Sequence, residues 1–216
     1  MELIFIDAKY KKKVKLGNII KKLPKKIGLI TTIQFVDSIK DMKKELENEN
    51  FEVFISKGIQ ENYGQLLGCE SSAALSINKN VEAYLYVGTG KFHPINVAMQ
   101  TEKTVFTFNP FTKEFETMDK KHIEKIKSRK TGAMLKYLNS ENIGIIVTTK
   151  PGQCDFDKAI KLKKKLIKNG KNAFIFMDNT YNLQSLEDFN FIEAWVNTAC
   201  PRIVEDITCV NINDLI

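Results

Sequence analysis

The sequence predicts an α/β fold of two related lobes, each a parallel sheet flanked by helices, with a site in the cleft between them. Short apolar, β-branched segments alternate with segments of helical periodicity, which is typical of parallel sheets covered by helices. The series of strand, loop, lysine-rich helix and aromatic strand that begins at residues 27–32 begins again at residues 143–149. We therefore place the lobes at residues 1–139 and 140–216, joined at a short polar stretch.

The expected elements of the first lobe are bounded by proline, glycine and capping residues. The residue before Pro24 disfavours helical backbone and ends the first helix, and Asp37 or Ser38 can cap the second. The expected order is a strand at 3–6, a helix at 14–22, a strand at 27–32, a helix to about 48, a strand at 51–55, a small-residue helix after Cys69, a strand at 81–87, a helix at 95–99, a strand at 104–108 and a helix at 118–138 interrupted near Gly132.

The second lobe repeats the start of the first. After the strand at 143–149 we expect a capped, lysine-rich helix and an aromatic strand at 173–176. A further strand around Trp195 and a terminal strand containing Cys209 complete the lobe.

Composition places the chain among ordinary globular proteins, with 43% hydrophobic and 27% charged residues. It holds no apolar run of membrane-spanning length, and its start lacks the basic region of a signal peptide. We therefore expect a cytoplasmic location and no membrane partner. In that compartment, four cysteines are thiols or metal ligands more often than disulfides.

A net positive charge, here +7, is common among nucleic-acid-binding proteins. Here, however, the lysines are spread over several predicted helices instead of one arm. Within residues 158–171, Ala159, Leu162 and Leu166 recur at helical spacing, so the lysines between them form the solvated face of an amphipathic helix. We therefore do not expect nucleic acid as a partner.

Two distant cysteines, Cys69 and Cys200, each stand in a loop of small residues. Gly68, next to Cys69, lets the backbone come close to whatever the sulfur binds. The wide separation of the two cysteines argues against a zinc finger or ribbon, whose ligands come in close pairs. A cysteine in such a loop can also be a small core residue. We interpret the two thiols as facing one shared site.

Other candidate residues also follow predicted strands, where parallel sheets place their ligand sites. Lys150 and Gln153 come after the strand at 143–149, and Cys154 follows them either as part of the same cleft or as the start of a helix.

The segment Gly88-Thr89-Gly90 is either a simple turn or a backbone cradle for an anionic ligand, with Lys91 beside it. His93 could serve as a general acid or base, or as a hydrogen-bonded structural group.

Five ordered motifs together resemble those of a known family, the archaeal diphthamide-synthesis enzymes called 2-(3-amino-3-carboxypropyl)histidine synthases. The motifs are Gly-Gln-Leu-Leu-Gly-Cys at 64–69, Gly-Thr-Gly-Lys-Phe-His at 88–93, Thr-Lys-Pro-Gly-Gln at 149–153, Asn-Thr-Ala-Cys-Pro-Arg at 197–202, and the segment 24–34. The resemblance spans almost the whole chain.

The resemblance implies a specific chemistry. Three related domains each give one cysteine to a [4Fe–4S] cluster, whose open iron binds S-adenosylmethionine. Carbon–sulfur cleavage then yields a 3-amino-3-carboxypropyl radical, which is transferred to a histidine of translation elongation factor 2. By motif, Cys69 matches the second-domain ligand and Cys200 the third-domain ligand. The resemblance also places a set of residues near the cofactor: Gln65, Gly68, Gly88, Gly90, Lys91, Lys150 and Gln153.

The chain departs from the family pattern in that its 216 residues match the second and third domains only. Two thiolates hold a cubane cluster poorly. Three expectations remain open. A separate first-domain polypeptide or a full-length homologue supplies the third cysteine in a homo- or heterodimer. Cys154 serves as the third ligand. Or the chain is an inactive paralogue that acts as a partner or scaffold subunit.

Overall fold

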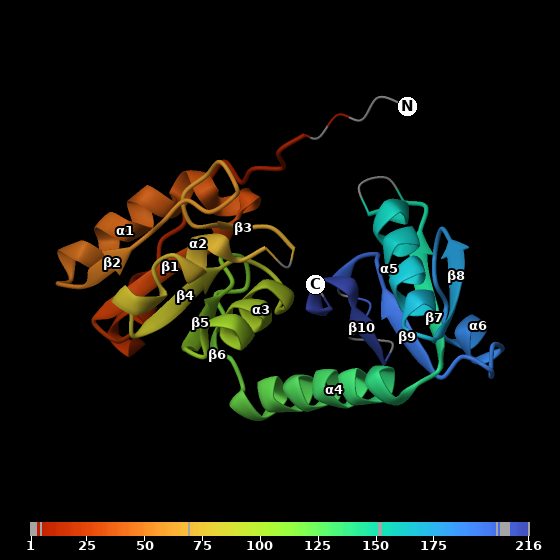
Figure 1. The fold of residues 1–216 in the computed structure, drawn as a ribbon. Coiled ribbons are helices and arrows are strands. Elements are labelled where there is room, and N and C mark those ends of the chain that lie inside the picture. Colours follow the sequence, from red (N-terminus) through yellow and green to blue (C-terminus); the bar gives the residue numbers. More distant parts are fainter. Residues whose placement is uncertain are drawn as a thin grey trace. The chain divides into compact units, whose positions relative to one another are not determined.

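A computed structural model of the chain describes residues 4, 6–68, 70–150, 153–201, 203 and 208–215, with side chains left aside at 183 and 184. The chain divides into two compact units, Met1–Ile123 and Glu124–Ile216. Each unit is organised around its own sheet (Figure 1). The expected boundary after residue 139 and the observed division lie at the two ends of one helix, α4 (Lys120–Asn139).

The first unit contains a sheet whose strands follow the order β2-β1-β4-β5-β6. Strands β2, β1, β4 and β5 are parallel, β6 is antiparallel to β5, and the short β3 extends the sheet beside the end of β1. The strands are β1 (Lys26–Thr32), β2 (Glu52–Phe54), β3 (Gln65–Leu66), β4 (Ala83–Val87), β5 (Thr104–Phe108) and β6 (Phe115–Thr117).

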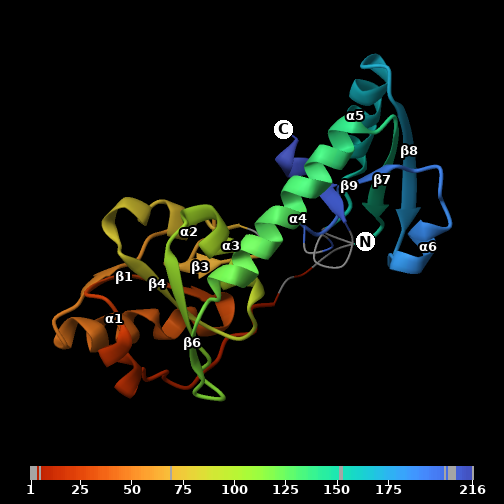
Figure 2. The same cartoon turned by 90° about the horizontal axis from the view of Figure 1, so that it is seen from below.

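Helices cover both faces of this sheet, with α1 on one side and α2 and α3 on the other (Figure 2). The first face also carries two 3-10 helices, η1 and η2, and the second carries η3. The bounds are η1 (Gly17–Lys22), η2 (Ile33–Ser38), α1 (Ile39–Asn48), α2 (Ser72–Leu75), η3 (Asn78–Asn80) and α3 (Phe92–Thr101).

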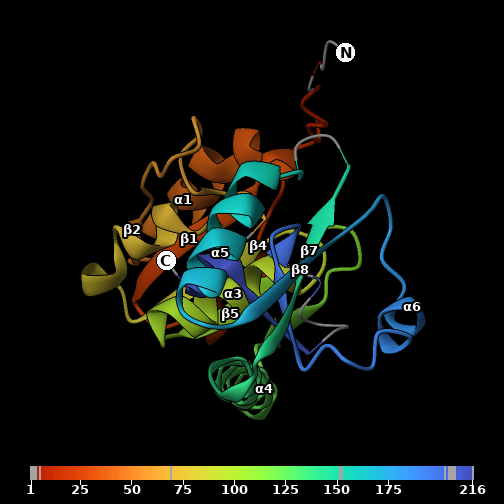
Figure 3. The same cartoon turned by 45° about the vertical axis from the view of Figure 1, so that its right-hand side comes forward.

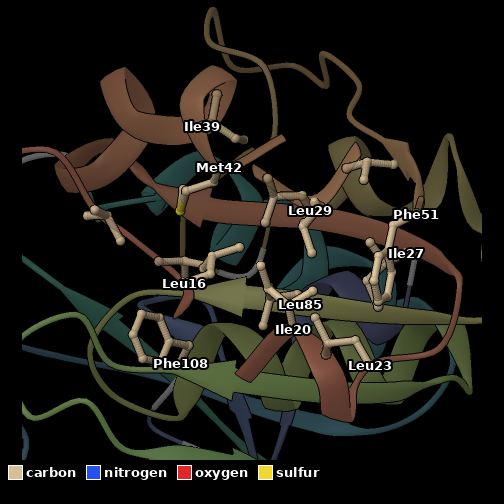
Figure 4. Packing of buried hydrophobic residues seen from close by; sticks show 14 of the residues in the cluster. Leu16, Ile20, Leu23, Ile27, Leu29, Ile39, Met42, Phe51, Leu85 and Phe108 are labelled. Atoms are coloured by element: carbon tan, nitrogen blue, oxygen red, sulfur yellow. The ribbon is translucent and has the colours of Figure 1, made fainter. Parts of the chain in front are cut away.

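Alternation along the strands fills a separate core on each face. Leu29 and Leu85 point toward α1 and pack with Ile39 and Met42 (Figure 4). The intervening residues, such as Tyr84, face α2 and α3. Because both faces are covered, the central strands are buried along almost their whole length, which is typical of parallel sheets.

The second unit contains a fully parallel sheet of order β10-β9-β7-β8. Helix α5 packs against one face of β7 and β8, and α6 contributes to the core on the other face (Figure 3). The elements are β7 (Asn142–Thr148), α5 (Phe156–Lys168), β8 (Asn172–Asp178), α6 (Leu183–Glu187), β9 (Ala194–Asn197), β10 (Cys209–Asn211) and a last 3-10 helix, η5 (Ile212–Asp214).

The two sheets share one strand order. Setting aside the short β3 and the antiparallel β6, each unit arranges its parallel strands as second, first, third, fourth along the chain. The predicted fold class, an α/β chain with parallel sheets flanked by helices, is confirmed, and the common order supports the predicted relation between the lobes.

Several predicted boundaries were wrong for identifiable reasons. Helix α4 runs through Gly132 without a break, because that glycine is on the exposed side of the helix and disturbs no packing. Helix α3 begins at Phe92, because Pro94 is tolerated in a first helical turn. Strand β6 and helix α6 were not predicted. Of the strand expected at 3–6, only Ile4 and Ile6 are described, and both are exposed and outside any strand.

Candidate functional site

The candidate residues of the first unit gather at the carboxyl ends of its parallel strands. The Thr31 hydroxyl of β1 donates a hydrogen bond to the Val87 carbonyl of β4 at 2.6 Å, and Gly88 N–H donates to the Phe108 carbonyl of β5 at 3.0 Å. These bonds join the three strand ends into one edge. In open α/β sheets, this edge is where ligands bind.

The segment after β2 enters this edge through Gly64. Its carbonyl accepts from Thr31 N–H at 2.8 Å, and its N–H donates to the Ser56 carbonyl at 2.7 Å. A Cβ at Gly64 would lie 2.3 Å from Ile39 Cδ1, and its φ of +67° is left-handed. Only glycine fits here without strain. The next residue, Gln65, is buried, and its side-chain oxygen accepts from Asn62 at 2.7 Å.

Cys69 itself lies outside the described residues, whereas its neighbours on both sides are described. Leu67 and Glu70 exchange two backbone hydrogen bonds, at 3.4 and 2.9 Å. Gly68 has a left-handed φ of +59°, and its N–H donates to His93 Nε2 at 3.3 Å. His93 lies in the first turn of α3, instead of in the loop that the sequence predicted.

Glu70 was missed by the sequence analysis. One of its carboxylate oxygens accepts from Ser72 N–H at 2.5 Å, and the other is buried without a hydrogen-bond partner among the described residues. A glutamate directly after Cys69 was the only signal that could have drawn attention to it. The Glu70 carboxyl group therefore lies at this edge, directly after a candidate ligand in the sequence.

The Gly88–Lys91 loop closes against Tyr86. A Cβ at Gly88 would meet the Tyr86 hydroxyl at 2.5 Å, so this position requires glycine. The Tyr86 hydroxyl donates to the Thr89 carbonyl at 3.1 Å, and burial raises the pKa of this phenol. Gly90 has a φ of +73°. Lys91 is exposed and pairs with Glu116 of β6 at 2.7 Å.

The second unit contains a pocket of about 480 Å³ at the carboxyl ends of β7, β8 and β9. It brings together three predicted site residues from distant parts of the sequence: Lys150, Gln153 and Cys200. The complete lining is Thr148, Lys150, Gln153, Asn179, Thr180, Tyr181, Asn182, Ala199, Cys200 and Ile203.

A buried asparagine shapes the cysteine side of this pocket. Asn197, 1% exposed, donates to the Cys200 carbonyl at 3.0 Å and to Asn211 at 2.8 Å, and it accepts from Ala199 N–H at 2.9 Å. The Thr198 hydroxyl donates to the Ile146 carbonyl of β7 at 2.8 Å. The turn that carries Cys200 is therefore fixed to two strands of the sheet.

The opposite wall, residues 179–182, was also missed. Its position directly after an aromatic strand was the available signal. The Thr148 hydroxyl donates to the Asn179 carbonyl at 3.3 Å, which ties the wall to β7. The Tyr181 hydroxyl accepts from Val147 N–H at 3.2 Å and is within donating distance of the Phe176 carbonyl, at 2.6 Å. Burial raises the pKa of Tyr181, so this wall is polar but uncharged.

The described cysteines occupy three different environments. Cys200 is a free, partly exposed thiol at the pocket, whereas Cys154 is exposed and does not line it. Cys209 is buried in β10, and burial raises the pKa of its thiol to about 12. Within the described residues, no group of three or more His, Cys, Asp or Glu side chains could hold a metal ion.

Pro151, Gly152 and Arg202, which belong to the sequence motifs, lie outside the described residues. Among the parts of the chain that are described, no helix combines the length and apolar character needed to cross a membrane.

Comparisons with known proteins agree over most of the chain. The sequence model of the diphthamide synthesis protein family matches residues 1–207. A 2-(3-amino-3-carboxypropyl)histidine synthase from Pyrococcus horikoshii is 37% identical over 189 residues, covering 87% of this chain and 53% of that protein. A subunit 1 of the same synthase from Schizosaccharomyces pombe is 28% identical over 213 residues, covering 94% of this chain and 48% of that protein.

The fold is similar to that of a solved structure. The crystal structure of Dph2 from Pyrococcus horikoshii with a 4Fe-4S cluster matches with a TM-score of 0.75 and 34% identity, covering 91% of this chain and 57% of that chain. The chain thus spans about half the length of the curated relatives it matches.

Proposed function

Because the chain belongs to the family of diphthamide synthesis proteins, we propose that it takes part in the first step of diphthamide biosynthesis. The reaction is transfer of a 3-amino-3-carboxypropyl group from S-adenosylmethionine to a histidine of translation elongation factor 2. The observation that carries this proposal is the family match over residues 1–207. The pocket that joins Cys200 to the Lys150 segment supports it.

The transfer balances without an added oxidant or reductant. The bond between the sulfonium sulfur and the γ-carbon of the methionine part breaks, and methylthioadenosine leaves. The γ-carbon joins the histidine ring, which releases one proton. The positive charge of the sulfonium is thereby replaced by that of the released proton. A reduced [4Fe–4S] cluster, when bound, would supply one electron for carbon–sulfur cleavage and would take one electron back as the histidine adduct loses its proton, so the transfer is redox-neutral overall.

The residues of this chain can supply some of the ligands of an iron–sulfur cluster. Thiolates are the usual ligands of such clusters, and Cys200 is a free thiol that reaches a pocket from a turn fixed by Asn197. Cys69 is the second proposed ligand. A third comes from Cys154 or from a domain outside these 216 residues, either of the same assembly or of a full-length homologue.

Other residues of the two units would bind and orient the S-adenosylmethionine. Lys150 lines the pocket, and its ammonium would suit a carboxylate, while Gln153 and the 179–182 wall offer uncharged polar groups. In the first unit, Gly90 would leave its exposed backbone accessible to the ligand, while Gly88, whose N–H is bonded to the Phe108 carbonyl, and the buried Gln65 would shape the edge. Lys91 would have to exchange its partner Glu116 for a ligand carboxylate.

The fission yeast relative is named as a subunit 1, so some relatives work beside another polypeptide. We propose that this chain also works in a dimer or larger assembly that presents elongation factor 2 to the site. In the second candidate function, the chain holds no cluster and acts as a partner or scaffold subunit for a full-length homologue. The name of the fission yeast relative, a subunit 1, is the observation that favours this candidate.

The test uses the assembly co-purified from its native cell and reconstituted anaerobically with iron and sulfide. We expect Cys69→Ala and Cys200→Ala to lose iron and activity. Cys209→Ala is the matched control, because it removes a buried thiol from the core and should keep its iron. Cys154→Ala identifies or excludes that residue as the third ligand.

The product distinguishes the candidates. After reduction with dithionite, a single turnover should yield methylthioadenosine and modified elongation factor 2. Formation of 5′-deoxyadenosine and methionine instead, or undiminished activity of Cys69→Ala, would contradict the enzymatic proposal. A stable complex with a homologue whose activity is unaffected by either cysteine variant would favour the scaffold function.

A further inference from the structure

We propose that His93 and Asn96 are positioning residues that hold Gly68 and Ser71, which lie on either side of Cys69. This inference rests on the proposed function of Cys69 as a cluster ligand. It gives His93 a different role from the proton transfer that its residue type suggested, and it assigns a role to Asn96, which no motif had singled out.

The hydrogen bonds carry the proposal. His93 Nε2 accepts from Gly68 N–H at 3.3 Å, and Asn96 Nδ2 donates to Ser71 Oγ at 2.8 Å. The two side chains are three residues apart in α3 and therefore share one face of the helix. They reach the residue directly before Cys69 and the residue two after it.

The helix that provides these contacts is itself firmly anchored. The ring of His93 stacks on Tyr86 of β4, with centroids 6.1 Å apart and planes at 18°. Tyr86 is fully buried, and its hydroxyl is bound to the Thr89 carbonyl. Val97 and Ala98, in the next turn of α3, are buried in the same core. The side chains that reach residues 68 and 71 therefore extend from a rigid base.

The hydrogen-bond geometry also defines the state of the imidazole. Nε2 is assigned as the acceptor of the Gly68 N–H, and this assignment places the proton of a neutral ring on Nδ1. The nitrogen facing the Cys69 segment is thus occupied as an acceptor. Supporting hydrogen bonds of this kind orient metal ligands in other proteins, and their loss weakens metal binding.

The variants follow from the position of the accepting atom. The amide oxygen in His93→Gln can take the place of Nε2, whereas the shorter side chain in His93→Asn cannot reach Gly68. Asn96→Ala removes the bond to Ser71 and leaves the bond to Gly68 in place. Circular dichroism of each full-length variant verifies that it is folded.

The first measurement uses the protein without iron, so it does not depend on the proposed function. Hydrogen exchange by NMR follows the Gly68 amide. Loss of one hydrogen bond should speed its exchange on the order of fivefold in His93→Asn, with near-normal exchange in His93→Gln and Asn96→Ala. Equal rates in wild type and His93→Asn would overturn the proposal, as would a His93→Gln rate as fast as that of His93→Asn.

The second measurement follows alkylation of the thiols by mass spectrometry. His93→Asn and Asn96→Ala should each raise the alkylation rate of Cys69, because its flanking backbone is freer, while Cys154 and Cys200 in the same chain stay unchanged as internal controls. A Cys69 rate unaltered in both variants would overturn the proposal. Should His93→Asn fail to fold, Asn96→Ala and His93→Gln still decide between these outcomes.

The third measurement uses the reconstituted assembly. Loss of a supporting bond should make iron leave about tenfold faster to a chelator in His93→Asn than in His93→Gln. An altered Gly68 amide and Cys69 thiol without any effect on iron retention would show that the positioning is correct but that Cys69 is not a ligand. The failure of the proposed function is thereby distinguished from the failure of this inference.

Discussion

Gly64 illustrates how much of this site depends on a single residue type. Its left-handed backbone allows the chain to turn into β3, and the absence of a side chain allows contact with Ile39 and the Leu29 carbonyl. Gly17 has a similar φ, +61°, but nothing lies within 4 Å of a Cβ built there. Substituting each of the two glycines therefore distinguishes the cost of backbone strain from the cost of steric overlap.

We predict that Gly17→Ala costs about 1–2 kcal/mol, the strain of a left-handed alanine alone. Gly64→Ala should cost more, because its methyl group would overlap Ile39 Cδ1 and force the core to shift. Urea denaturation of the two variants tests this comparison. Equal losses of stability would mean that the packing around Gly64 relaxes without cost.

At the scale of single residues, the sequence identified the residues of the candidate site more reliably than the residues that they contact. Lys150, Gln153 and Cys200 were predicted and line one pocket. The pairing of Lys91 with Glu116 could not be predicted, because it depends on strand β6, which the sequence analysis missed. Glu70 was overlooked for a similar reason, since burial of a single carboxylate oxygen is a product of tertiary packing.

At the scale of elements, α5 shows how its own sequence specifies where it begins. The Asp155 side chain accepts from Lys158 N–H at 3.2 Å and pairs with the Lys158 ammonium at 2.6 Å. The side-chain hydrogen bond to Lys158 is the main cause that lowers the pKa of Asp155 below its ordinary value. The carboxylate is therefore favoured in the folded state.

A lowered pKa means that the stabilisation is present above the ordinary aspartate pKa and is lost as pH falls through the folded-state pKa. Asp155→Ala should cost about 1 kcal/mol near neutral pH and less in acid. Asp155→Asn is the matched control, because asparagine caps a helix at any pH. Denaturation at several pH values tests both, and a pH-independent loss in Asp155→Ala would contradict the assigned role.

The bounds of helices and strands were predictable where the hydrophobic periodicity was strong, and less predictable where they depend on contacts with the rest of the fold. Strand β5 was predicted to the residue, and β1, β4 and β7 to within two residues at either end. The break expected at Gly132 did not occur, because a single exposed glycine costs a helix only about 1 kcal/mol. The start of α3 was placed too late because Pro94 was taken as a boundary.

At the scale of the whole molecule, each unit has cores of its own. Leu29 of β1 and Ile145 of β7 are both fully buried at the centre of the first strand of their sheets. Either residue substituted by alanine leaves a cavity that costs about 2–5 kcal/mol. The pair offers a matched test of how independently the units unfold.

We predict that Leu29→Ala weakens hydrogen-exchange protection mainly within residues 6–123 and that Ile145→Ala does so mainly within residues 124–215. Mass spectrometry of peptides from the full chain measures both. A similar loss of protection throughout the chain in either variant would mean that the two units unfold as a single cooperative body.

The shared strand order of the two sheets bears on how such a chain arose. Cys200 follows the third parallel strand of its unit, and the counterpart of that strand in the other unit is β4, which leads to Gly88. Cys69 instead follows the short β3, within the connection between β2 and β4. If both units descend from one duplicated ancestor, the two copies share the order of the strands but not the loop that carries the cysteine. Each cysteine then arose independently after the duplication, in a different loop at the inherited edge of the sheet.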